Sequence, residues 1–301
     1  MGYTRIDLST YIVISIWFGC NNDCTICMLS GIKHSLPPIG FNRFQEVLLD
    51  ISNEGRFENL ILSGAEVTTC GDVDRYIRCA ASLGWFKKIQ IQTNGRRLAD
   101  RAYLRQLIES GVSEFFISIH GLEEVHDGIT NRPGSFRETM AGIRNLEAWP
   151  VNVITNTVLT KWNYRDVVPL MNQLGQTKAS EIHLWNFYPM ESTDTRDFIV
   201  NIQDFTSLLE RLGPTFEAAG KPLILKSFPE CLTAPAPALF DSLYPVTILP
   251  DRFWQKFDQS GFGTCYHRQN GECTNRECWG LSKAYCHKYG DERDRLSPMT
   301  G

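Results

Sequence analysis

The chain has 301 residues, of which 43% are hydrophobic, and its formal net charge is −4. This composition supports a substantial buried core and argues against a broad nucleic-acid-binding surface. The apolar run 11–18 lacks a basic leader and a cleavage site, and it is too short to span a membrane. We therefore expect a cytoplasmic protein without membrane association, whose ten cysteines are reduced and act as metal ligands rather than disulfides.

Strand-like and helix-like segments alternate along most of the chain. The predicted strands are 11–18, 60–62, 89–95, 115–120, 151–159 and 182–185. The predicted helices are 41–51, 73–83, 104–108, 135–146, 166–174 and 205–216. This alternation implies parallel strands joined by helical crossovers, and therefore an α/β fold.

Two local signals refine the predicted helices. Ser135 and Glu138 have the spacing of a capping box at the start of a helix. Pro214 is expected to kink or split the helix over 205–216. After about residue 225 the alternation ends, and Pro, Gly, Cys and aromatic residues dominate. We therefore expect a first unit over residues 1–225 and a smaller, loop-rich unit over residues 226–301.

A short loop with three cysteines follows the first predicted strand. Cys20, Cys24 and Cys27 have the spacing C-x3-C-x2-C. Three thiolates can hold three irons of a cubane cluster and leave the fourth iron open to a substrate or cofactor. A zinc site would instead need four nitrogen or sulfur ligands, usually in paired spacing, and no second pair lies near this loop. Three buried thiols are the remaining alternative.

This loop, placed after a first strand, resembles the radical S-adenosylmethionine (SAM) superfamily. The resemblance implies a partial (β/α)6 TIM-like barrel with chemistry at the C-terminal ends of its strands. It also implies that the amino and carboxylate groups of SAM chelate the open iron of a [4Fe–4S] cluster. The reduced cluster of such enzymes cleaves SAM and releases a 5′-deoxyadenosyl radical.

The resemblance assigns SAM-binding roles at several strand ends. Gly64, Ala65 and Glu66 stand where the family commonly has Gly-Gly-Glu, with Ala65 as a mild departure. Their backbone and acid are expected to contact the amino group of SAM, although a turn with a solvated Glu is the alternative. Ile26 occupies a position where many members have an aromatic residue against the adenine, and it also suits ordinary core packing.

Polar residues at the next strand ends complete the expected SAM site. Asn94, Ser118 and Asn156 close or flank the third to fifth predicted strands. The resemblance implies that such residues hold the carboxylate and ribose of SAM. A turn Asn and strand residues that face helices are the alternative explanation.

Histidines near the later strand ends are candidate catalytic residues. The stretch 116–121, followed by 125–127 and 133–136, resembles one subgroup of the superfamily. His120 and His183 are predicted to bind substrate or move a proton, whereas His126 more simply fixes a turn through a hydrogen bond. Trp185 and its polar and aromatic neighbours are typical of the wall of a substrate-binding site. Core packing explains Trp185 equally well.

Five further cysteines lie in the C-terminal region. They are Cys231, Cys265, Cys273, Cys278 and Cys286. Together with the nearby Trp-Gly and Tyr-Gly-Asp motifs, they resemble the SPASM and twitch extensions that carry auxiliary [4Fe–4S] clusters. Five thiols suit one such cluster, and the first four are the predicted ligands. Cys286 is a substitute ligand or a free thiol near the site, and zinc is the alternative metal.

The predicted function is that of a radical SAM enzyme that abstracts hydrogen from its substrate. A sugar, nucleoside or other natural-product precursor is favoured, because the first strand begins near Tyr11 and leaves no room for an N-terminal leader-binding domain. The auxiliary cluster is expected to aid an oxidation or rearrangement, and a reductase, flavodoxin or ferredoxin to supply electrons. The alternatives are a maturase of a ribosomal peptide and a non-catalytic iron–sulfur or zinc sensor or scaffold.

Overall fold

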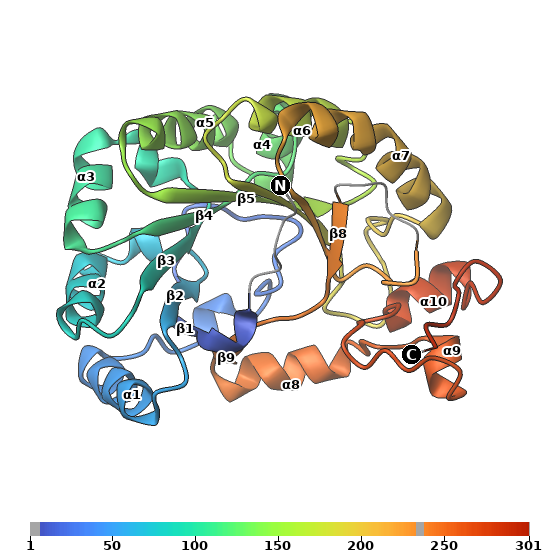
Figure 1. Cartoon of the computed structure of the whole chain (residues 1–301), viewed down its shortest axis with the longest axis horizontal. Coiled ribbons are helices and arrows are strands. Elements are labelled where there is room, and N and C mark those ends of the chain that lie inside the picture. Colours follow the sequence, from blue (N-terminus) through green and yellow to red (C-terminus); the bar gives the residue numbers. More distant parts are fainter. Residues whose placement is uncertain (1–6, 233–237, 301) are drawn as a thin grey trace.

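The structure, a computed structural model, describes residues 7–232 and 238–300 (Figure 1). Its centre is a single parallel sheet with the strand order β8-β7-β6-β5-β4-β3-β2-β1-β9. The strands are β1 (Tyr11–Trp17), β2 (Asn59–Gly64), β3 (Lys88–Thr93), β4 (Glu114–Ser118), β5 (Asn152–Leu159), β6 (Glu181–Asn186), β7 (Leu223–Lys226), β8 (Ala238–Asp241) and β9 (Val246–Ile248). The predicted α/β partial TIM-like barrel is confirmed, and its first six strands are those predicted from the sequence.

Helices cover the outer face of the sheet, as Figure 1 shows. They are α1 (Phe41–Glu54), α2 (Val73–Ser82), α3 (Arg101–Ser110), α4 (Glu123–Thr130), α5 (Ser135–Asn145), α6 (Val167–Gly175) and α7 (Ile202–Ala219). Each turns its apolar stripe inward: in α1, Phe44, Val47, Leu48 and Ile51 are all buried. Burial of each such side chain contributes about 1.5–3 kcal/mol, so this face holds the crossover helices on the strands.

The predicted capping box is wrong, and of the two outcomes predicted at Pro214, a kink or a split, the split does not occur. Helix α7 runs through Pro214 without splitting; Pro214 is exposed, so the carbonyl that loses its donor can bond to water. The start of α5 is not a capping box, because the N-cap residue is Gly134 and it makes no side-chain cap bond. Instead Asp127, near the end of α4, accepts hydrogen bonds from the backbone N–H groups of Gly134 (2.5 Å) and Phe136 (2.8 Å).

The last part of the chain joins the same sheet before it reaches the cysteines. Strand β8 pairs with β7, and β9 pairs with β1, so the two outermost strands are consecutive in sequence. Residues 242–245 connect them, and this connection can span at most about 18 Å. The two edges of the sheet therefore lie close together. The division near residue 225 remains a prediction, although β8 and β9 beyond it belong to the sheet.

The C-terminal region contains short helices rather than loops alone. They are α8 (Asp251–Gln259), α9 (Tyr266–Gln269) and α10 (Lys283–Tyr289). Phe253 of α8 packs with Phe18 and Leu29, and Tyr285 of α10 packs with Ile26 and Ile129. Both contacts fix this region against the loop that follows β1. Among the described residues, no helix has the length and apolarity needed to cross a membrane.

A pair of buried histidines links β4, α4 and β5. The backbone N–H of His120 donates to Nδ1 of His126 (3.0 Å), and the N–H of Val158 donates to Nδ1 of His120 (3.2 Å). The two rings stack with centroids 5.9 Å apart. Burial lowers the pKa of His120 to about 3 and the pKa of His126 to about 4. Both rings are therefore neutral near pH 7, and they accept hydrogen bonds through Nδ1.

This pair predicts a loss of stability in mild acid. The ordinary pKa of histidine is 6.5, so the unfolded chain binds protons below that pH while the folded pair does not. The free energy of unfolding should be highest above about pH 6.5 and fall toward pH 4 by about 1.4 kcal/mol per pH unit for each histidine. His126→Asn places Oδ1 where Nδ1 accepts the hydrogen bond, and it removes one titrating group.

Urea unfolding of the reduced, metal-free protein between pH 7 and pH 4.5 measures this slope. The His126→Asn variant should lose the contribution of one histidine, about 1.4 kcal/mol per pH unit. The control His34→Asn, at an exposed position, should keep the slope of the original protein. An unchanged slope in His126→Asn would contradict the neutral, buried state of the pair.

Candidate functional site

The three-cysteine loop lies at the C-terminal end of β1. Cys20 is exposed, while Cys24 and Cys27 are partly buried. A glycine is needed at position 19, because a Cβ there would lie 2.6 Å from Nε1 of Trp17. Burial raises the pKa of the Cys24 thiol to about 12, and the charges of Cys27 and Cys20 add to the rise. The loop thus brings together thiols whose joint ionisation would need a positive partner, a charge that the iron of a bound cluster would supply.

Bonds from two other elements hold this loop in place. The N–H groups of Asp23 and Thr25 donate to the carbonyls of Thr130 (3.1 Å) and Ile129 (2.8 Å), at the end of α4. After β3, Nη1 of Arg96 donates to the carbonyl of Asn21 (2.6 Å) and to Oδ1 of Asn22 (2.8 Å). Nδ2 of Asn94 also donates to Oδ1 of Asn21 (2.7 Å). The conformation of the loop is therefore set by β3 and α4 as well as β1.

The predicted SAM motif at the end of β2 begins with a residue whose backbone conformation is rarely adopted by residues other than glycine. Gly64 has φ +144°, and a Cβ there would lie 1.9 Å from the carbonyl oxygen of Trp17. Only glycine fits this position. Ala65 does not have a positive φ, and its N–H donates to the carbonyl of Trp17 (2.8 Å). Alanine in place of the second glycine of Gly-Gly-Glu therefore introduces no backbone strain.

Glu66 is a buried link between two strand ends. Its Oε2 accepts from the N–H of Asn94 (2.6 Å), and its Oε1 accepts from the hydroxyls of Thr93 (2.7 Å) and Thr68 (2.6 Å) and the N–H of Thr68 (3.1 Å). Burial raises its pKa, and these hydrogen bonds oppose the rise. Since a carboxylate offers about four acceptor positions, Oε2 retains capacity for a further donor.

The remaining predicted SAM residues occupy different environments. Ser118, Asn156 and His183 are side by side in β4, β5 and β6 by strand register. Oδ1 of Asn156 is buried and has no partner within the described residues. Ile26 packs in an apolar cluster with Ile129 and residues of the C-terminal region. Asn156 lies within β5 and not at its end, beside Ser118 at the end of β4, and its orphaned acceptor fits a ligand with hydroxyl groups, such as the ribose of SAM.

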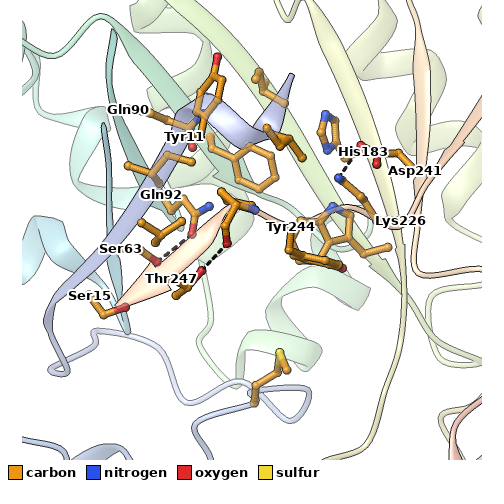
Figure 2. Close-up of a pocket in the computed structure, with 18 of the residues that line it drawn as sticks. Tyr11, Ser15, Ser63, Gln90, Gln92, His183, Lys226, Asp241, Tyr244 and Thr247 are labelled. Carbon is orange, nitrogen blue, oxygen red and sulfur yellow. Dashed lines mark hydrogen bonds and ion pairs between the residues drawn. The ribbon is translucent and has the colours of Figure 1, made fainter. Parts of the chain in front are cut away.

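A cavity of about 680 Å³ lies inside the partial barrel that the sheet forms (Figure 2). Met28 and Leu29, directly after Cys27, line it together with Gly64 and inward-facing side chains of all the strands. Most of its wall is apolar and aromatic. At one side Nζ of Lys226 pairs with Oδ2 of Asp241 (2.6 Å). This volume is typical of small-ligand sites.

His183 faces this cavity from β6. Its Nε2 lies 3.0 Å from Oε2 of Glu181, and its ring meets Phe116 edge-on at 5.3 Å. Burial lowers the pKa of His183, while Glu181 opposes the shift. Nδ1 is buried and has no partner within the described residues, and neither has Nε1 of Trp185, two residues on. This part of the wall therefore offers unsatisfied polar atoms to a ligand.

The three predicted catalytic residues do not meet at one point. His183 lines the large cavity, but His120 and Cys286 do not. His120 is enclosed by His126 and β5, as described above. Sγ of Cys286, on α10, donates to the carbonyl of Thr264 (3.6 Å). Of the three, His183 is the residue placed to touch a ligand in that cavity.

Several residues of this site were missed in the sequence. Arg96, which anchors the cysteine loop, directly follows Thr-Asn-Gly, and its proximity to that motif was the available signal. Lys226 is the one polar residue of the strand Leu223–Lys226, and a lysine directly after three apolar residues was its signal in the sequence. Tyr244 and Thr247 carried no signal, because the crossing of residues 242–245 depends on tertiary structure.

Four of the five C-terminal cysteines share a second, smaller cavity. Its lining includes Cys231, Cys265, Cys273 and Cys278. Sγ of Cys278 accepts hydrogen bonds from the N–H groups of Gly280 (3.3 Å) and Glu230 (3.5 Å). All ten cysteines are free. Within the described ranges, no three His, Cys, Asp or Glu side chains form a group that could hold a metal ion.

The neighbouring His267 is already engaged. Its Nδ1 lies 2.6 Å from Oε2 of Glu272, and its Nε2 lies 3.0 Å from the carbonyl oxygen of Arg293. Both ring nitrogens thus have partners, so His267 is not placed to bind a metal in the small cavity, whereas four cysteines line it. A set of thiol donors around a space suits a soft metal centre such as an iron–sulfur cluster or zinc.

Comparisons with known proteins agree with this geometry. An AdoMet-dependent heme synthase of Methanosarcina barkeri is 28% identical over 183 residues, 60% of this chain and 51% of that protein. The sporulation killing factor maturation protein SkfB of Bacillus subtilis is 24% identical over 57% of this chain and 42% of that protein. This chain thus spans about half the length of the curated relatives it matches.

Solved structures share the fold. Streptococcus suis SuiB bound to precursor peptide SuiA superposes with a TM-score of 0.61 at 14% identity, over 78% of this chain and 49% of that chain. The sequence model of the Radical SAM superfamily matches residues 14–174, which include the cysteine loop and strands β2 to β5. The chain belongs to the radical SAM superfamily.

Proposed function

We propose that the chain is an enzyme that cleaves SAM at a [4Fe–4S] cluster held by Cys20, Cys24 and Cys27. One observation carries this proposal: the residues directly after Cys27 line the large cavity of the sheet. A radical formed at the loop would enter a space that can hold a substrate. A reduced cluster bound there would supply the electron for cleavage of SAM to methionine and a 5′-deoxyadenosyl radical, and that radical would take a hydrogen atom from the substrate.

The chain's own residues bind and orient the cofactor. The backbone of Gly64 and Ala65 and the remaining acceptor position of Glu66 suit the amino group of SAM. Oδ1 of Asn156 and the hydroxyl of Ser118 suit the ribose hydroxyls. Asn94 acts by holding Asn21 and Glu66, and Ile26 supports the loop from its apolar side. The aromatic wall of the cavity excludes water from the reacting groups.

We also propose one auxiliary [4Fe–4S] cluster, held by Cys231, Cys265, Cys273 and Cys278. The shared cavity supports this set of ligands. Four protein thiolates leave no open iron, so this cluster would accept or relay an electron and not bind substrate. Cys286 stays outside this set. Residues 226–301 would accordingly function as the auxiliary-cluster subdomain.

The reaction is then an oxidation or rearrangement that begins with hydrogen abstraction. The substrate is a small natural-product precursor or, in the alternative that the likeness to SkfB supports, a ribosomal peptide. A reductase, flavodoxin or ferredoxin would supply the electron. A cytoplasmic location agrees with the free state of the cysteines. A non-catalytic iron–sulfur or zinc sensor remains the alternative, and the two experiments below separate it from an enzyme.

The loop cysteines should be necessary for SAM cleavage. Replacement of Cys20, Cys24 and Cys27 with Ala removes the thiolates proposed to hold the cluster, so formation of 5′-deoxyadenosine under dithionite should fall to background. Chromatography of the anaerobic reaction measures this product. Cys79→Ala, on the outer helix α2, is the matched control and should keep full activity. Undiminished cleavage in the triple variant would refute the proposal.

The C-terminal cysteines should hold the second cluster. The reconstituted protein should contain about eight irons per chain. Replacement of Cys231, Cys265, Cys273 and Cys278 with Ala should leave about four irons, together with SAM cleavage in the absence of substrate. Iron and sulfide analysis gives the count, and Cys286→Ala should retain all the iron. Loss of iron in Cys286→Ala, or a zinc ion in place of the second cluster, would contradict this assignment.

A further inference from the structure

We infer that the large cavity binds a neutral, largely apolar substrate group that carries an amide or a hydroxyl, hydrogen-bonded to Nδ1 of His183 and Nε1 of Trp185. This inference rests on the proposed function, because it names the substrate class of the same site. Both side chains come from β6, and both atoms are buried without a partner in the described parts of the chain. A buried polar atom left unpaired is destabilising, so a ligand that pairs both atoms gains affinity.

The two atoms differ in hydrogen-bonding role. Oε2 of Glu181 lies 3.0 Å from Nε2 of His183, and a carboxylate oxygen accepts a hydrogen bond from the N–H at that position. Nδ1 of the neutral ring is then an acceptor. Nε1 of Trp185 is always a donor. A secondary amide offers an N–H to the first and a carbonyl to the second, and a hydroxyl can do both with one oxygen.

The charge of the wall argues against anionic substrates. Of the described residues that line the cavity, Lys226 is the single Lys or Arg, and the acids are Glu114, Glu181 and Asp241. Nζ of Lys226 already donates to Asp241 (2.6 Å) and to the carbonyl of Leu243 (2.7 Å). A phosphate or several carboxylates would thus enter a wall with more acids than bases. Desolvation of such a charge without compensation is costly.

The rest of the wall suits an apolar body. The ring of Trp185 meets Phe116 at 6.0 Å and Tyr244 at 5.5 Å, which fixes the direction of its N–H. Met28 and Trp254, 37% and 36% exposed, line the cavity where it reaches the surface. An aromatic or aliphatic group can therefore pass an apolar entrance and place one polar function against β6.

Matched probes test this inference on the reconstituted enzyme with SAM present. N-acetyl-phenylalanine N-methylamide and N-acetyl-phenylalanine differ by one charge and share the apolar body. Ligand-observed NMR titration should show the neutral amide binding at least about tenfold more tightly than the carboxylate, and no binding of inorganic triphosphate. Equal or tighter binding of the carboxylate or triphosphate, or no binding of the amide, would overturn the inference.

A pair of tryptophan variants tests the contact itself. Trp185→Phe keeps an aromatic ring and deletes the N–H, so it should weaken amide binding by about threefold to tenfold. Trp162→Phe makes the same change at an exposed position that does not line the cavity, and should change binding less than about twofold. Equal effects of the two variants would contradict the role of Trp185.

The outcome is separable from the proposed function. The same enzyme preparation is first assayed for 5′-deoxyadenosine formation without any probe. A preparation that cleaves SAM and prefers the anionic probes overturns only the inference about substrate class. A preparation that cleaves no SAM overturns the proposed function, whatever the probes do.

Discussion

The cysteine loop after β1 keeps its shape because neighbouring elements bond to its backbone, and the rest of the site depends on this restraint. Arg96 and Asn94 reach it from β3, and the last carbonyls of α4 reach it from the other side. Glu66 then ties the end of β2 to Asn94. Three consecutive strand ends are thereby joined by buried polar contacts, which position a ligand more rigidly than a free loop could.

The C-terminal region extends this restraint to the substrate side. Helices α8 and α10 pack on apolar residues of the loop. Strands β8 and β9 and the connection between them bring Asp241, Thr247 and Tyr244 into the cavity (Figure 2). The same region then gathers four cysteines around a second cavity. Apolar packing therefore connects the loop that contains Cys20, Cys24 and Cys27 with the region that contains the C-terminal cysteines. Electron transfer and substrate binding would depend on the same segment of chain.

Much of the fold could be predicted from the sequence, because local patterns determine it. The alternating apolar runs identified β1 to β6 and six of the covering helices, and the loop spacing identified the cysteines. Helix α4 was missed: it is only eight residues long and contains Gly128, so its pattern is weak. Strands β8 and β9 are four and three residues long, and β9 pairs with β1, at the opposite end of the chain.

The site was predictable where chemistry follows residue type and unpredictable where it follows burial. Cysteine spacing pointed to ligands, and four of the five C-terminal thiols do share a cavity. Nothing in the sequence distinguished His183, which faces the cavity, from His120, which is enclosed beside His126. The four hydrogen bonds of Glu66 were equally invisible. Such distinctions arise only when distant segments pack.

The most direct test of the account is whether SAM binds to the cluster of the loop. The variant that lacks Cys231, Cys265, Cys273 and Cys278 would contain only the loop cluster. Its reduced form would be examined by pulsed electron–nuclear double resonance. The added SAM would carry ¹⁵N at the amino group and ¹⁷O at the carboxylate. The account predicts hyperfine coupling from both labels. A cluster signal that is identical with and without labelled SAM would contradict it.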